Sequence, residues 1–208
     1  MTAHRNSRGR SLTDYPRPSV AVDTAVLTFA DDALSVLLVE SDGELRLPGT
    51  FLHEGERLAD AVARSLRTKA GIDGLDPRQL HVFDALDRDD RGWVLSVAHV
   101  TVVPLEQLGA AQGRLTPIAE ATGLRYDHDE IVGLAVDWIR ERYASSPDPL
   151  LLLGDAFTLR DLQRLHETIA GTSLPRDSFR RSMERQLTET GRRLEGVVGK
   201  PPRLFRRR

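Results

Sequence analysis

The chain has 208 residues, of which 40 % are hydrophobic and 29 % charged, and it contains no cysteine. This length suits one large domain or two small ones. The lack of cysteine excludes disulfides, thiolate zinc sites and cysteine nucleophiles. No apolar run is long enough to span a membrane and the N-terminus has no apolar signal core, so we expect a cytoplasmic protein without membrane contact.

The net charge of −2 conceals two regions of opposite sign. Residues 150–208 hold 13 Lys and Arg against 7 Asp and Glu, whereas residues 1–149 hold 16 against 24. Such a split predicts two modules with different partners. We therefore expect a flexible tail over 1–18, a first domain over 19–144, a linker "SSPDP" over 145–149, and a basic second domain over 150–208.

The first domain opens with two β-branched and apolar runs, "SVAVDTAVLTF" and "LSVLLVE", which predict strands. The polar segment "ADDA" between them predicts a hairpin turn. A short strand follows in "ELRLPGTFLHEGE", where Pro48, Gly49 and Gly55 predict a loop.

Two helices and a second hairpin complete the first domain. The first helix is expected to begin near Glu56 or Arg57 and to end at Gly71, because apolar side chains at 58, 62 and 66 share one face. "LHVFDALDR" and "WVLSVAHVTVV" predict a hairpin around the turn "DDRG". Apolar spacing predicts the second helix from about Asp129 to Tyr143.

The second domain reads as two short helices and a β-hairpin. "FTLRDLQRLHETIAG" carries a variant capping box at Thr158 and Asp161, and "PRDSFRRSMERQL" follows with Pro175 at its start and an apolar stripe at 179, 183 and 187. The glycine-containing basic segment "TGRRLEGVVGKPPRLFRRR" predicts a wing. This order is typical of a winged helix-turn-helix that binds DNA, although a cationic helix face can also be plain solvated surface.

The expected DNA contacts are the polar and basic positions of this module, because Arg and Lys neutralise phosphates and a helix can reach base edges. They are Thr158, Arg160, Arg176, Ser178, Arg180, Arg181, Arg185, Lys200 and Arg203. An adaptor that binds another protein through its basic tail is the alternative for this region.

The first helix has the layout of the Nudix box without most of its acids. Glu56, Arg64 and Gly71 fall on box positions, but the three later glutamates are replaced by Ser65, Thr68 and Lys69. Carboxylates three and four apart on a helix converge on Mg²⁺ in that box. Exchanging three anions for two hydroxyls and one cation repels a divalent ion, so we expect neither a metal site nor catalytic residues.

The chain resembles the Nudix-related transcriptional regulators of NAD metabolism, the NrtR family, over about residues 20–208. The resemblance rests on the order of "LRLPGTFLHEGERLADAVARSLRTKAGI", "RDDRGWVLSV", "LRYDHDEIV", "FTLRDLQRLHETIAG", "SFRR" and "GKPPRLFRR". It implies an α+β fold, in which a Nudix-like α/β/α sandwich with a mixed sheet precedes a winged helix-turn-helix. It also implies a homodimeric bacterial repressor that grips a palindromic operator at NAD synthesis or salvage genes.

The resemblance further implies that ADP-ribose or a related NAD-derived nucleotide is the effector, with no required cofactor. Candidate phosphate contacts are Arg46 and Arg64, the latter also able to pair with Glu56. Phe51 and Trp93 are candidate adenine-stacking faces, and Asp127 or His128 could bind a ribose hydroxyl. Each of these residues also has an explanation that involves no ligand. Phe51 and Trp93 could pack in the core, Arg64 could form a structural ion pair, and His128 could be an ordinary residue at the start of a helix. The alternative function is a divergent pyrophosphatase for ADP-ribose-type nucleotides that recruits metal through Glu54 and Glu56.

Overall fold

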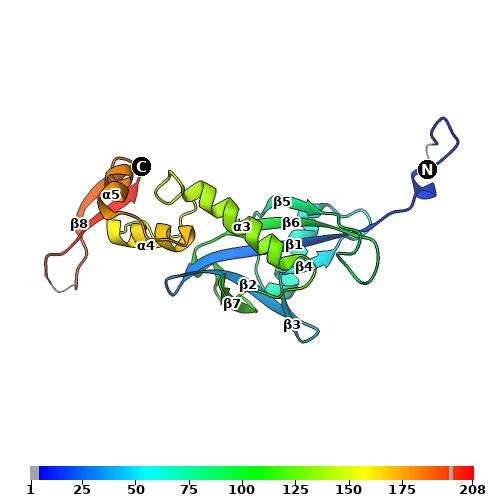
Figure 1. Cartoon of the computed structure of the whole chain (residues 1–208), viewed down its shortest axis with the longest axis horizontal. Helices are drawn as coiled ribbons and strands as arrows, with labels where there is room; N and C mark the ends of the chain where they lie inside the picture. Colours follow the sequence, from blue (N-terminus) through cyan, green and yellow to red (C-terminus); the bar gives the residue numbers. More distant parts are fainter. Residues whose placement is uncertain (1–4, 197–198) are drawn as a thin grey trace.

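The computed structural model of the chain describes residues 5–196 and 199–208. Residues 1–4 of the expected tail, and residues 197–198 of the expected wing, lie outside the described residues. Figure 1 shows a sheet with its helices in the middle of an elongated molecule and a small second unit at one end. Within the described ranges, no helix combines the length and the apolarity that crossing a bilayer requires.

The first two strands form the hairpin that the sequence predicts. β1 (Ser19–Ala30) and β2 (Ala33–Ser41) pair antiparallel up to Ala30 and Ala33. Asp31 and Asp32 make the turn, with positive φ angles of 48° and 60°. Aspartate tolerates this left-handed conformation better than most residues, which suits it to the turn.

The sheet is mixed, as expected, because β1 pairs with its neighbours in both directions. Its order is β3-β2-β1-β6-β5, with β4 added to β1 and β7 to β2. β1 runs parallel to β6 (Val94–Val102) and antiparallel to β2 and to β4 (Gly49–Phe51). The remaining strands are β3 (Glu44–Arg46), β5 (Arg78–Phe83) and β7 (Arg114–Pro117). The second predicted hairpin is confirmed by the antiparallel pairing of β5 with β6.

Helices cover both faces of the sheet. Alternate residues of β1 enter two separate cores, Val22 and Val26 on one face and Ala25 and Leu27 on the other. α1 (Leu58–Ser65) packs into the first core, and α3 (His128–Tyr143) packs into the second. A third, short helix is α2 (Leu105–Leu108). The period of two along a strand thus produces the expected α/β/α sandwich.

The box helix differs from its prediction in its first residue and in its winding after Ser65. α1 begins at Leu58 because Arg57 is extended, with φ −82° and ψ 154°. After Ser65 the chain continues as a π-helical segment, η2 (Leu66–Ala70), and stops at Gly71 with a φ of 67°. Gly71 therefore has the predicted left-handed terminating role. π-helical turns inside helices frequently occur at functional sites.

The second unit is a winged helix. It consists of α4 (Leu159–Ala170), α5 (Arg176–Glu184), β8 (Leu187–Arg193) and β9 (Arg203–Arg207). The capping box of Thr158 and Asp161 is present. α5 ends three residues before the predicted limit because Leu187 opens β8. A small core joins these elements, formed by Phe157, Leu162, Phe179, Met183, Leu187 and Phe205.

Candidate functional site

A pocket of about 200 Å³ opens in the first domain beside the box helix. Its wall combines β1 to β4, the π-helical segment, the loop between β5 and β6, and Tyr126, two residues before α3. Phe51 and Tyr126 are the aromatic lining residues. Seven lining residues are charged: Asp23, Asp42, Arg46, Lys69, Arg88, Asp89 and Arg91. Four cations against three anions suit the pocket to an anionic ligand that also presents a flat ring.

Asp23 forms a buried part of the pocket wall. Its Oδ2 accepts a hydrogen bond of 2.5 Å from Ser96 Oγ, and its Oδ1 lies 3.3 Å from His128 Nε2. Burial alone would raise the pKa of Asp23, but the hydrogen bonds from His128 and Ser96 outweigh it and lower the pKa. A Cβ at Gly49 would lie 1.9 Å from Asp23 Oδ1, so the close approach of β4 requires glycine there.

Tyr126 is surrounded by guanidinium groups. The Arg46 and Arg91 guanidinium carbons lie 5.2 and 5.1 Å from its ring centre, and Arg91 is also 5.0 Å from the ring of Phe51. Arg91 binds Asp89 through two hydrogen bonds of 2.8 and 2.7 Å, which raise the pKa of Arg91. Stacked and paired arginines of this kind are fixed in direction and present their remaining donors to a ligand.

Arg88 holds the backbone at Tyr126 in an unusual conformation. Its side chain is 2 % exposed, with Nε donating to Asp127 Oδ2 at 2.7 Å and Nη2 donating to the Tyr126 carbonyl at 3.0 Å. Tyr126 and Asp127 have positive φ angles of 61° and 65°. Consecutive left-handed residues other than glycine are strained and persist where their surroundings fix them, often at functional sites.

The box helix is joined to the pocket loop by Glu56 and Arg64. Arg64 Nε and Nη2 each donate to a Glu56 carboxylate oxygen at 2.8 Å. Arg64 also donates to Thr50 Oγ1 at 3.2 Å and to the Phe51 carbonyl at 2.9 Å. The hydrogen bonds that the Glu56 carboxylate accepts from Arg64, and from the His53 amide at 2.9 Å, lower the pKa of Glu56 to about 2. The pair therefore fixes Thr50 and Phe51, which line the pocket, while neither charged side chain is itself a lining residue.

The predicted ligand residues divide into three groups. Arg46 and Phe51 line the pocket, whereas Glu56, Arg64 and Asp127 lie behind it as supports. His128 is buried: its Nδ1 accepts from the Leu47 amide at 3.1 Å, and its Nε2 faces Asp23. Trp93 is 47 % exposed and does not line the pocket.

Sequence reasoning missed most of the charged lining residues. They are Asp23, Asp42, Lys69, Arg88, Asp89 and Arg91, together with Tyr126. The charged run "RDDR" was interpreted as part of a hairpin turn and as one of the stretches that carry the resemblance, and no ligand contact was assigned to it. Two arginines flanking two aspartates in one short loop were the signal available in the sequence.

The pocket does not fit the magnesium of the Nudix box. No three His, Asp or Glu side chains among the described residues cluster closely enough to hold a metal ion. The remaining box acid, Glu56, is bound by Arg64, and Lys69 brings a positive charge to the pocket wall.

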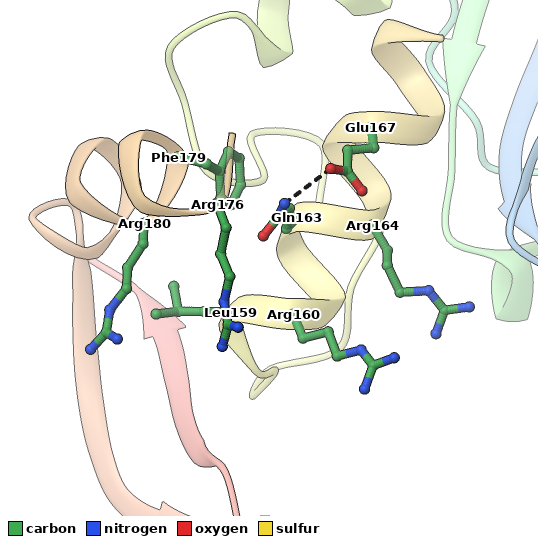
Figure 2. Close-up of a pocket in the computed structure, with 8 residues that line it drawn as sticks. All are labelled: Leu159, Arg160, Gln163, Arg164, Glu167, Arg176, Phe179 and Arg180. Atoms are coloured by element: carbon green, nitrogen blue, oxygen red, sulfur yellow. Dashed lines mark hydrogen bonds between the residues drawn. The ribbon is translucent and has the colours of Figure 1, made fainter. Parts of the chain in front are cut away.

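A second site lies in the winged helix, where arginines line a groove of about 540 Å³ between α4 and α5. Figure 2 shows Arg160, Arg164, Arg176 and Arg180 extending their side chains in the same general direction from the two helices. A second hollow of about 660 Å³ shares these four arginines and continues to the wing, where Lys200 and Arg203 line it. Together the two hollows form the arginine-lined groove.

The basic side chains of this groove differ in their ion pairs. Arg180 pairs with Glu184 at 3.0 Å, and Arg203 pairs with Glu189 at 2.9 Å. Within residues 5–196 and 199–208, Arg160, Arg176 and Lys200 belong to no ion pair. Their charges are therefore available to phosphate groups.

The other predicted DNA contacts either do not line the arginine-lined groove or have a structural role. Thr158 is 4 % exposed and caps α4 by accepting from the Asp161 amide, although it borders the wing-side hollow. Ser178 faces a different hollow, between α3 and α5. Arg181 is exposed on α5, and Arg185 lies beside the linker. Arg164 lines the groove but was not predicted.

The fold and these two sites define a two-domain protein in which a Nudix-like sandwich precedes a winged helix. The model of the NrtR DNA-binding winged helix domain matches residues 149–207. The chain is 26 % identical to the ADPR responsive transcriptional repressor NtrR of Acinetobacter baylyi, over 93 % of this chain and 84 % of that protein.

Solved structures show the same relationship. Shewanella oneidensis NrtR in complex with a 27mer DNA is 28 % identical, with a TM-score of 0.74 over 91 % of this chain and 93 % of that one. The isolated NUDIX domain of S. oneidensis NrtR with ADP ribose is 25 % identical, with a TM-score of 0.56 over 64 % of this chain and 95 % of that one. The second domain therefore matches the winged helix of the NrtR family, and the chain is similar over more than nine-tenths of its length to proteins named as NrtR or NtrR.

Proposed function

We propose that this chain is a DNA-binding transcriptional repressor whose Nudix-like domain senses ADP-ribose or a related NAD-derived nucleotide. The observation that carries the proposal is the joining of a cation-lined pocket to an arginine-lined groove in one chain, in the arrangement of a relative solved with DNA. We further propose a homodimer that binds a palindromic operator at genes of NAD synthesis or salvage.

The groove supplies the chemistry for DNA. Arg160, Arg176 and Lys200 would neutralise phosphates, while the exposed Arg181 on α5 would face the operator. A winged helix places its second helix in the major groove, which gives α5 the recognition role.

The pocket supplies the chemistry for a sensor instead of a hydrolase. Arg46 and Arg91 present donors to phosphate oxygens, and Phe51 and Tyr126 offer aromatic faces. Hydrolysis in a Nudix site depends on clustered carboxylates, which the lining does not provide. Binding that favours one arrangement of the two domains would change the affinity for DNA by the same coupling free energy.

The test is a mobility-shift titration of the full chain on its own promoter region, with and without ADP-ribose. Specific binding that weakens steeply with salt and responds to ADP-ribose supports the proposal. Absence of specific DNA binding, or steady release of AMP from ADP-ribose with magnesium, would instead support the adaptor or the pyrophosphatase.

Arg46→Ala tests the nucleotide pocket independently of the DNA-binding domain. Arg46 lines the pocket with a side chain that is 15 % exposed, so its loss should weaken ADP-ribose binding by about 10-fold or more while leaving DNA binding intact. Arg125→Ala is the matched control, because Arg125 also stacks on Tyr126 but does not line the pocket. Calorimetry with ADP-ribose and a mobility shift on both variants make the comparison.

A further inference from the structure

Lys69 is the only one of the three exchanged box positions whose side chain lines the pocket. Ser65 is fully buried, and the exposed Thr68 donates its hydroxyl to the Arg64 carbonyl at 2.8 Å. Lys69 lies on the π-helical segment and faces the same space as Arg46 and Arg91. A lysine at this glutamate position of the box therefore changes the charge of the pocket wall.

The acids that share this pocket are already engaged. Asp42 pairs with Arg46 at 3.3 Å, and Asp89 pairs with Arg91 at 2.7 Å. Asp23 accepts from Ser96 and faces His128. In the part of the chain that the structure describes, Lys69 has no carboxylate within ion-pair distance.

The surroundings of Lys69 make it more receptive to an anion. The Lys69 side chain is exposed, and the desolvation that it still undergoes beside the pocket lowers its pKa; the nearby charges of Arg46 and Arg91 act in the same direction, against Asp23 and Asp42. An anionic ligand in the pocket would oppose this shift by stabilising the ammonium form. The pocket thus holds a cation whose charge the surrounding protein only partly balances.

We infer that Lys69 binds the diphosphate of the nucleotide directly, in place of a divalent cation, so that the chain recognises its effector without metal. This inference rests on the proposed function and adds to it a binding residue and a metal requirement. Lys69, Arg46 and Arg91 would contact phosphate oxygens from separate walls, while Phe51 and Tyr126 contact a flat ring. The same three cations repel Mg²⁺, so added magnesium brings no extra affinity.

Calorimetry on the full chain tests this, with ADP-ribose, AMP and inorganic pyrophosphate as probes, each in EDTA and in Mg²⁺. Lys69→Met removes the charge and keeps much of the length, Lys69→Arg restores a charge, and Arg67→Met is the matched control. Arg67 lies on the same helical segment but pairs with Asp73 at 3.4 Å and does not line the pocket.

The wild-type chain should bind ADP-ribose equally in EDTA and in Mg²⁺. Lys69→Met should lose on the order of 10- to 100-fold in affinity for ADP-ribose and less for AMP, because a charge-assisted hydrogen bond to one phosphate group is lost. Lys69→Arg should recover most of the affinity, and Arg67→Met should match the wild type.

Magnesium-dependent binding by the wild type, or equal binding by Lys69→Met and Arg67→Met, would overturn the inference. Binding of pyrophosphate distinguishes a wrong role for Lys69 from a wrong choice of ADP-ribose as the effector. If ADP-ribose does not bind but pyrophosphate binds and is lost in Lys69→Met, Lys69 is still a diphosphate ligand and the proposed effector is wrong. If the wild type binds neither probe, the inference is wrong as well.

Discussion

Arg164 of α4 donates to the carboxylate of Asp32, which lies in the turn between β1 and β2. Thr168, one helical turn later, donates to the Asp32 carbonyl at 3.3 Å. Residues of the same hairpin, Asp23 and Val39 among them, line the pocket proposed for the nucleotide, and Arg164 lines the groove proposed for DNA. One hairpin of the first domain therefore contacts both sites.

Removing the Asp32 charge should strengthen non-specific DNA binding. In Asp32→Asn the guanidinium of Arg164 loses its partner and becomes available to a phosphate, so the affinity should rise by at most about fivefold, as for an exposed ion pair. The slope of log affinity against log salt should steepen by about 0.9. Fluorescence anisotropy on a random duplex at several salt concentrations measures both.

Asp31→Asn is the matched control for this change. Asp31 precedes Asp32 in the same turn, also has a positive φ, and forms no ion pair with Arg164. Asparagine tolerates that conformation, so both variants should fold. Equal DNA binding by the two variants would show that Asp32 does not restrain Arg164.

The unpaired arginines of the groove should carry sequence-independent binding. Arg160→Ala with Arg176→Ala removes two charges that belong to no ion pair among the described residues. Affinity for every duplex should fall, and the salt slope should decrease by about 1.8 if each arginine contacts one phosphate. Arg142→Ala, whose guanidinium stacks on Trp138 of α3, is the control and should bind as the wild type does. An unchanged salt slope in the double variant would place the DNA elsewhere.

The sequence predicts the fold well where a pattern repeats along one element. The β-branched and apolar runs of β1 and β2 and the capping box at Thr158 are local signals, and the structure contains the hairpin and the capped helix. The end of α5 was wrong because Leu187 continues the apolar spacing of the helix while packing as the first residue of β8. An apolar residue at this spacing could belong either to the helix or to the strand that follows it, and the sequence alone does not distinguish the two.

The pocket was harder to predict because it forms between distant segments. Asp23, Lys69, Arg88 and Tyr126 come from four elements, and no spacing along the chain relates them. Two of the predicted ligand residues, Arg64 in the box and His128 at the start of α3, proved to be tied to the protein by hydrogen bonds. Burial and prior pairing, which only the folded chain reveals, decide which polar residues remain free for a ligand.

The buried Asp148 should be important for the stability of the winged helix. Its side chain is fully buried and accepts from Tyr143 Oη at 2.6 Å, from the amides of Leu152 and Leu153 at 3.0 Å each, and from Arg207 Nη1 at 2.5 Å. Asp148→Asn leaves Arg207 without its anion and should lower the free energy of unfolding by about 3 kcal/mol.

Denaturant unfolding measures this loss, with Asp155→Asn as the control. Asp155 is an exposed acid in the same connection and belongs to no ion pair within the described residues. A loss below about 0.5 kcal/mol in Asp148→Asn, the range of ordinary surface changes, would show that the carboxylate does not stabilise the connection.

The pair of Glu56 and Arg64 should give the first domain an acid-dependent part of its stability. The pKa of Glu56 falls from 4.5 to about 2 because Arg64 hydrogen-bonds the carboxylate. A depressed folded pKa adds stability that is complete above the unfolded value of 4.5 and is lost as the pH falls toward 2. Glu56→Gln should therefore be less stable than the wild type at neutral pH, and the difference should shrink steadily below about pH 4.5.

Thermal unfolding of both proteins as a function of pH measures that difference, with Glu54→Gln as the control. Glu54 is an exposed acid in the same loop and does not pair with Arg64, so its variant should follow the wild-type curve throughout. A constant difference between Glu56→Gln and the wild type across this range would mean that the Glu56 charge is not what stabilises the loop.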